Sequence, residues 1–196
     1  MTPANKTLHL TAVPLRFIAA GELFGYFPKI VIREPDWLKE APVVEEICSV
    51  SNCISKAPPD WIDRWKHNKM WMYDSPELAW SVVPEQDRGR YTLFAYRILP
   101  HLFNESGETE LVLPDLSVVP IPDEFSRIGY DAVSRSCGTN FECSPLSCNH
   151  MAPEYPVNKH CLVDNLDTAV TMARTFARGN CEPGPYCVIE VWKACG

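Results

Sequence analysis

The chain has 196 residues, of which 46% are hydrophobic and 22% are charged, as expected for a folded globular protein and not for a disordered one. Its 25 acidic and 18 basic residues give a formal net charge of −7. An acidic surface argues against non-specific nucleic-acid binding and against docking on anionic lipid, because both need Lys and Arg to neutralise phosphate groups. We therefore expect neither a nucleic-acid partner nor a membrane partner.

The N-terminal residues and the cysteines indicate a compartment. Residues 1–7 lack the charged region, apolar run and small-residue cleavage site of a secretory signal, and the longest apolar stretches are far too short to cross a bilayer. Nine cysteines are an odd number, and seven of them follow residue 136. In a chain of this length without an export signal, the pattern favours reduced thiols over a disulfide scaffold. We therefore predict a soluble cytoplasmic protein.

The first half of the chain alternates strand and helix signals. Two strands are predicted over residues 7–17 and 27–33, with Gly21 and Gly25 marking the turn region between them. A Cys-bearing strand follows, and residues 60–65 are expected to add a helical turn or two. Ser75 is the expected cap of a short helix, and Pro76 takes its first position, where a missing N–H costs nothing. An aromatic strand is predicted over residues 91–98.

The second half follows a connector of different composition. A turn at residues 104–108 and a strand at 109–113 precede a proline-rich stretch. The clearest helix is capped by Asp164 or Asn165, shows an apolar stripe of 3.6-residue period, and has Gly179 where a left-handed C-cap is wanted. A last strand is predicted over residues 186–192. The predicted organisation is therefore as follows: a first α+β unit (1–103), a connector and hairpin (104–124), and a second α+β unit (125–196), which together can form one compact domain.

Two stretches of the chain resemble each other in order and spacing. The matching positions are Cys48 and Cys53 against Cys143 and Cys148, and residues 68–74 against residues 158–164. Each stretch is followed by a helix and an aromatic strand. We predict an α+β fold with few short helices, in which two related strand–helix–strand units surround a mostly antiparallel sheet. One interpretation is an internal duplication, and the other is that unrelated α+β segments share the same pattern.

The paired Cys-x4-Cys segments suggest a metal site. Four thiolates from two similar loops, Cys48, Cys53, Cys143 and Cys148, suit tetrahedral zinc, and His67, His150 and His160 are additional candidate ligands. Zinc is the one cofactor that the sequence suggests. The preferred interpretation is nevertheless that these cysteines are buried and act as small apolar residues, so no cofactor is expected. Zinc and a disulfide or redox pair stay open as alternatives.

Catalytic candidates are few. Asp131 begins a strand at a sheet end where a pocket can form, and the sequence places Arg135 and Glu142 nearby. Cys148 and His150 offer a thiol near an imidazole, although adjacent residues rarely face each other. His160 with Asp164 is a further acid–base pair to test. If the two halves leave a crevice, Asp131, Arg135, Glu142, Cys143 and Asn149 are expected to line it.

The aromatic residues point to recognition. Five of the six tryptophans fall between residues 37 and 80, and no phosphate-binding glycine loop or nucleophile elbow is present. Exposed tryptophan on an acidic surface suits a basic protein partner. The preferred hypothesis is a non-catalytic protein-binding or regulatory module of the inhibitor or immunity type. The alternative is a Cys-dependent metalloprotein or a small-molecule enzyme with its site at the junction of the halves.

Overall fold

The computed structural model describes most of the chain after residue 22. The described residues are 23–51, 58, 68, 72–104, 106–107, 109–111, 121–135, 143–179, 181–182 and 185–195. Several predicted features lie outside them: the strand over 7–17, Gly21, the helical turns over 60–65, Cys53, His67 and Glu142.

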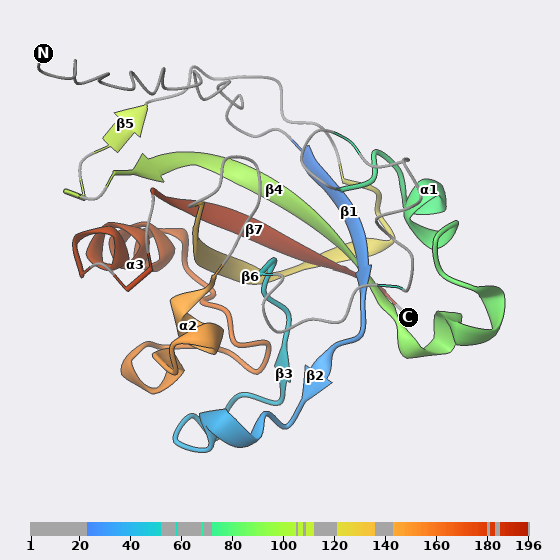
Figure 1. Ribbon diagram of the computed structural model, residues 1–196, viewed down its shortest axis with the longest axis horizontal. Coiled ribbons are helices and arrows are strands. Elements are labelled where there is room, and N and C mark those ends of the chain that lie inside the picture. The colour runs from blue at the N-terminus through green and yellow to red at the C-terminus, as the bar shows by residue number, and fades with distance from the viewer. Residues whose placement is uncertain are drawn as a thin grey trace, which may run out of the picture.

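An antiparallel sheet forms the centre of the molecule (Figure 1). Its main strands lie in the order β1 (Leu23–Lys29), β4 (Thr92–Phe103), β7 (Tyr186–Ala194) and β6 (Phe125–Ser134), and β5 (Thr109–Leu111) pairs with β4. Each of these pairings is antiparallel. The α+β class, the mostly antiparallel sheet and the few short helices are thus confirmed.

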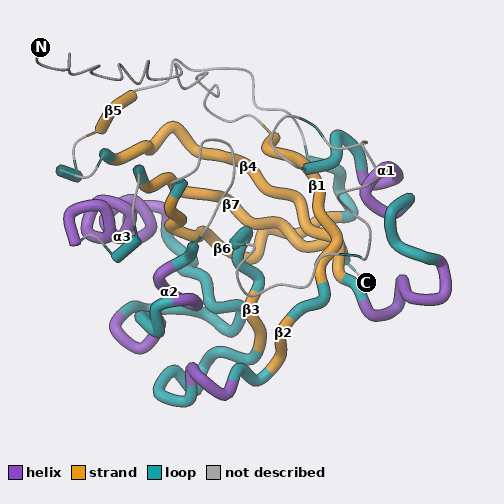
Figure 2. Tube along the Cα trace, in the orientation of Figure 1, coloured by secondary structure: helices purple, strands orange, loops and turns teal. Residues whose placement is uncertain are grey.

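A second, two-stranded sheet projects from the first. Strands β2 (Ile32–Arg33) and β3 (Glu46–Ile47) form it, with a 3-10 turn over Asp36–Leu38 between them. Figure 2 shows this arm below the main sheet, with β3 returning toward it. The predicted strand over 27–33 is therefore divided between β1 and β2.

A one-turn helix, α1 (Pro76–Trp80), and a 14-residue helix, α3 (Leu166–Gly179), lie near opposite ends of the sheet (Figure 1). In α1, Ser75 Oγ accepts a hydrogen bond from the Leu78 amide at 3.2 Å, so the predicted cap is present. In α3, Asn165 Oδ1 accepts from the Thr168 amide at 3.1 Å, which selects Asn165 over Asp164 as the cap. Two short helices, α2 (Pro145–Cys148) and a 3-10 turn over Ala152–Glu154, precede α3.

The apolar stripe of α3 packs as the periodicity predicts. Ala169, Met172 and Phe176 are fully buried against β6 and β7. The expected left-handed C-cap at Gly179 is wrong, because Gly179 still belongs to the helix and is not among the described glycines of positive φ. A glycine permits the left-handed turn but does not impose it. No helix in the described part of the chain is long and apolar enough to cross a membrane.

One set of contacts occurs twice, once beside β1 and once beside β6. Beside β1, the main chains of Tyr26 and Tyr73 exchange two hydrogen bonds, and Asn68 Nδ2 donates to Asp74 Oδ1 at 3.0 Å. The Asn68 amide donates to Met72 O, while Asn68 Oδ1 accepts from the Met72 amide.

The contacts beside β6 repeat this arrangement residue for residue. Tyr130 and Val163 exchange two main-chain bonds, and Asn158 Nδ2 donates to Asp164 Oδ1 at 2.7 Å. Asn158 also exchanges bonds with the main chain of Leu162. The two aspartates therefore hold loop asparagines against the sheet, and Asp164 does not cap the helix that follows it.

Glycine is required where these loops cross the strands. Gly25 and Gly129 have φ of +136° and +145°, and both lie at an irregularity in strand register. A Cβ on Gly129 would lie 2.9 Å from Leu162 Cβ and 3.0 Å from Val163 O. Both the backbone conformation and the close approach of the loop exclude a side chain there.

Replacing Gly129 with alanine is expected to lower the free energy of unfolding by about 2–4 kcal/mol, because it adds positive-φ strain to a clash with backbone. Urea denaturation measures the change. Gly89→Ala is the matched control, since a Cβ at Gly89 meets nothing within 4 Å. Equal stability of the two variants would contradict this account of Gly129.

Candidate functional site

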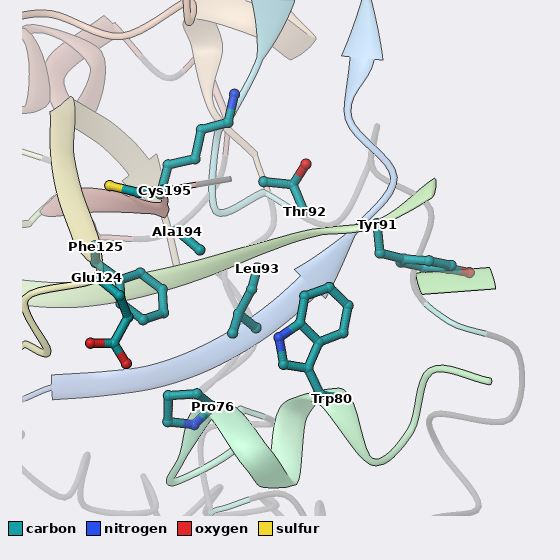
Figure 3. Close-up of a pocket in the computed structure, with 10 residues that line it drawn as sticks. Pro76, Trp80, Tyr91, Thr92, Leu93, Glu124, Phe125, Ala194 and Cys195 are labelled. Atoms are coloured by element: carbon teal, nitrogen blue, oxygen red, sulfur yellow. The ribbon is translucent and has the colours of Figure 1, made fainter. Parts of the chain in front are cut away.

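A pocket of about 490 Å³ opens where elements of the first half meet elements of the second. Its first-half wall is formed by α1 and the start of β4, and its second-half wall by the start of β6 and the end of β7. The lining residues are Pro76, Trp80, Tyr91, Thr92, Leu93, Glu124, Phe125, Lys193, Ala194 and Cys195. Figure 3 shows the Trp80 indole rising from α1 toward Leu93, with Glu124 and Phe125 across the hollow.

Glu124 supplies the carboxylate that lines the pocket. The neighbouring Tyr26 ring packs on Phe125 at a centroid distance of 5.5 Å. Burial raises the pKa of Tyr26, and the charges of Glu124 and Glu77 raise it further. Lys193 lines the pocket, but its ammonium lies 2.5 Å from Glu46 Oε1, so that charge is already paired.

A second polar site surrounds Asp131 on β6. Asp131 is fully buried, and Ser144 Oγ donates to its Oδ1 at 2.7 Å. Lys29, buried at the end of β1, donates to the carbonyls of Ser49, Val50 and Ser51 at 3.2, 2.7 and 3.1 Å. The segment after β3 is thus fixed beside Asp131 by a lysine ammonium.

Burial dominates the ionisation of Asp131. Desolvation raises its pKa from 3.8 to about 6, although hydrogen bonds from Ser49 and Ser144 and the charge of Lys29 act in the opposite direction. The carboxyl therefore keeps its proton in the folded protein at pH values where an unfolded chain would release it.

A third cluster joins the two halves at Glu46, the first residue of β3. Its Oε1 lies 2.6 Å from His160 Nδ1, 2.5 Å from Lys193 Nζ and 3.4 Å from Cys48 Sγ. Cys48 Sγ lies 3.9 Å from His160 Nδ1. Glu46 and Cys48 are buried, and the side chain of His160 is 14% exposed.

The electrostatics of this cluster favour an ionised Glu46 beside a neutral thiol. The hydrogen bond with His160 lowers the pKa of Glu46 to about 2, with help from Lys193 and against the effect of burial. Burial raises the pKa of Cys48 well above its usual value, and the charge of Glu46 adds to this. Among the described residues, Glu46, Cys48 and His160 form the one group of three or more donor side chains close enough to share a metal ion.

The structure separates several residues that the sequence grouped. Cys148 Sγ lies 3.5 Å from Ser51 Oγ, so the two Cys-bearing segments do approach each other, but Cys143 and Cys148 are not in the donor group of Cys48. His150 Nδ1 lies 3.0 Å from the carbonyl of Trp37. The described candidates thus lie at different points along the contact between the first and second halves of the chain.

The remaining candidates have structural contacts. The buried Arg135 donates its amide to the Pro185 carbonyl at 2.9 Å, and Asn149 donates to Glu182 at 3.0 Å. The pairing of His160 with Asp164 is wrong, because His160 contacts Glu46 and Asp164 accepts from Asn158. The turn between Asn158 and Asp164 directs the imidazole toward β3.

Sequence reasoning missed Glu46 and Lys193. Glu46 could have been predicted to lie near Cys48, because residues two apart on a strand share a face and Glu46 stands two residues before Cys48. Lys193 carried none, because only the fold brings the end of β7 beside β3. Searches of protein families, curated proteins and solved structures found no match to this chain.

Asp131 makes stability depend on pH. The folded state binds more protons than the unfolded state between pH 3.8 and about 6, so the wild type loses stability as pH rises through that window. That rise in the pKa of Asp131 corresponds to about 3 kcal/mol of unfolding free energy. Relative to wild type, Asp131→Asn should therefore gain about 3 kcal/mol of unfolding free energy between pH 4 and pH 7.

Urea unfolding at a series of pH values measures this difference. Asp36→Asn, which changes a side chain that is 94% exposed, is the matched control and should show no comparable trend. A constant difference between Asp131→Asn and wild type across the window would mean that folding does not raise the pKa of Asp131.

Proposed function

We propose that this protein is a non-catalytic binding module that takes an organic cation, presented by a basic protein partner, into the pocket between α1 and the sheet. The observation that carries the proposal is the lining itself, which combines aromatic rings with a carboxylate at the junction of the two halves. A cation next to an apolar stem, as in Arg or Lys, matches such walls, because aromatic faces attract cations and a carboxylate pairs with them.

Size and charge support this choice of ligand. A volume of about 490 Å³ lies within the range of ordinary ligand pockets and admits one or two side chains. The net charge of −7 would steer a basic partner toward the molecule. Trp80, which is half-buried on the short helix α1, is the expected anchor, since tryptophan is enriched among the residues that dominate binding energy.

We also propose that the two halves arose by internal duplication. The repeated hydrogen bonds of Asn68 with Asp74 and of Asn158 with Asp164 support this. Gly25 in β1 and Gly129 in β6 also lie at equivalent places. Register supports it further: Gly25 pairs with Tyr96, Gly129 pairs with Val191, and Tyr96 pairs with Val191. The test is to superpose β1, β4 and the Asn68–Asp74 contact on β6, β7 and the Asn158–Asp164 contact in an experimental structure. Failure of these two sets to superpose together would contradict a duplication.

The setting we propose is the cytoplasm. Buried thiols at Cys161 and Cys187 support it, because they serve as core atoms and a reducing compartment keeps them in that state.

Two synthetic peptides test the binding proposal, one alternating Arg with Leu and one with Glu replacing each Arg. The Arg peptide should bind, with an affinity that falls as salt is raised, and the Glu peptide should not. Trp80→Ala should weaken binding by about 2 kcal/mol, roughly 30-fold, because it removes the largest aromatic wall. Glu124→Gln should weaken binding less and reduce its salt dependence. Fluorescence polarisation of labelled peptide measures all of these.

Two variants outside the pocket serve as controls. Trp37→Ala removes an exposed tryptophan, and Glu40→Gln removes an exposed carboxylate. Both should bind like wild type. Equal binding of the two peptides, or wild-type affinity in Trp80→Ala, would refute the proposal.

A further inference from the structure

The cluster at Glu46 has a geometry that an acid–base relay would not have. In a Cys–His–carboxylate relay, the thiol contacts one ring nitrogen and the carboxylate contacts the other. Here both contact the same nitrogen, because His160 Nδ1 lies 2.6 Å from Glu46 Oε1 and 3.9 Å from Cys48 Sγ. The sulfur, nitrogen and oxygen therefore all lie within 4.8 Å of one another.

The distances between these three atoms approach those of a metal site. Tetrahedral zinc sets sulfur about 3.6 Å from each lighter ligand and sets nitrogen and oxygen about 3.4 Å apart. The two distances to Cys48 Sγ, 3.4 and 3.9 Å, already lie close to that value. The third distance, 2.6 Å between His160 Nδ1 and Glu46 Oε1, is shorter because these two atoms share a hydrogen bond. A bound metal would replace that hydrogen bond.

The main chain holds the three donors in place. The amides of Glu45 and Glu46 donate to the Lys159 carbonyl at 2.9 and 3.0 Å, and the Cys48 amide donates to the His160 carbonyl at 3.2 Å. The His160 amide in turn donates to Asn158 Oδ1 at 2.9 Å. Residues over a hundred positions apart in sequence are thus fixed together by backbone, which lowers the entropy cost of collecting ligands.

We propose that Glu46, Cys48 and His160 form a binding site for zinc or a similar borderline transition-metal ion. Thiolate, imidazole and carboxylate together suit zinc, whereas calcium and magnesium prefer oxygen alone. Three protein ligands leave a fourth position for water or another ligand, as in sites that are open to reaction. Binding releases the Cys48 thiol proton to solvent, together with any proton held between His160 and Glu46. The argument for this site does not rest on the peptide-binding proposal, although the two sites share Lys193.

Lys193 competes with the metal for Glu46. Its ammonium lies 2.5 Å from Glu46 Oε1, and its side chain is 25% exposed, so it can turn outward when an ion enters. Removing that positive charge should strengthen binding. Lys193→Met is therefore expected to raise the affinity for zinc, a result that a purely structural hydrogen-bond network does not predict.

Cobalt substitution tests the site in the full-length reduced protein. One equivalent of Co²⁺ should give the visible bands of a tetrahedral site and a thiolate charge-transfer band, and Zn²⁺ should displace it. Cys48→Ser and His160→Gln should each lose these bands and weaken zinc binding at least about 100-fold, since even outer-shell changes cost 10–100-fold. Circular dichroism and urea unfolding check that each variant folds; His160→Gln keeps the partly exposed position and its amide bond to Asn158.

Control variants separate this site from other thiols. Cys181→Ser and Cys195→Ser lie outside the donor group and should keep the cobalt spectrum. Unchanged bands in a folded Cys48→Ser or His160→Gln variant would place the metal elsewhere. Absence of any thiolate band in wild type, or lower zinc affinity in Lys193→Met, would also overturn the proposal.

Discussion

The antiparallel pairing of β4 with β7 is the interaction on which the rest of the structure depends. Tyr96 opposes Val191 at its centre, and each strand carries the outer strand of its own half, β1 or β6. The same register sets Phe94 opposite Lys193. A slip of one residue would turn every side chain of β7 to the other face of the sheet. The aromatic pocket and the Glu46 cluster would then both lose Lys193, so one pairing positions both candidate sites.

The second constraint is the cost of burying polar groups at the seam between the halves. The segment after β3 brings main-chain carbonyls into the interior, and Lys29 satisfies three of them through residues 49–51. Asp131 is tolerated there with a raised pKa and a donor in Ser144. Such groups are retained only where partners are close, since an unpaired buried charge costs several kcal/mol. The halves are therefore joined by specific polar contacts as well as by apolar packing.

Local signals were readable in the sequence, and long-range ones were not. Ser75 with Pro76, Asn165, and the apolar stripe of α3 were predictable because capping and periodicity act within a few residues. The likeness of residues 68–74 and 158–164 pointed to the two segments that contact β1 and β6, but it did not reveal their asparagine-to-aspartate hydrogen bonds. Cys48 and His160 were both named as candidate zinc ligands, but their juxtaposition with Glu46 escaped prediction, because β3 reaches His160 only through the β2–β3 arm. Pairing His160 with Asp164 failed for the same reason: proximity in sequence concealed a partner over a hundred residues away.

Lys193 connects the two proposals, because it lines the pocket and also pairs with Glu46. While its ammonium is held by Glu46, Glu124 supplies the negative charge of the pocket lining. A metal ion on Glu46 would release that ammonium and leave an unpaired positive charge beside the pocket. Metal binding and cation binding should then oppose each other, and linkage requires the opposition to be equal in both directions. The junction of the halves would thereby act as a single electrostatic unit, in which the occupant of one site sets the charge presented by the other.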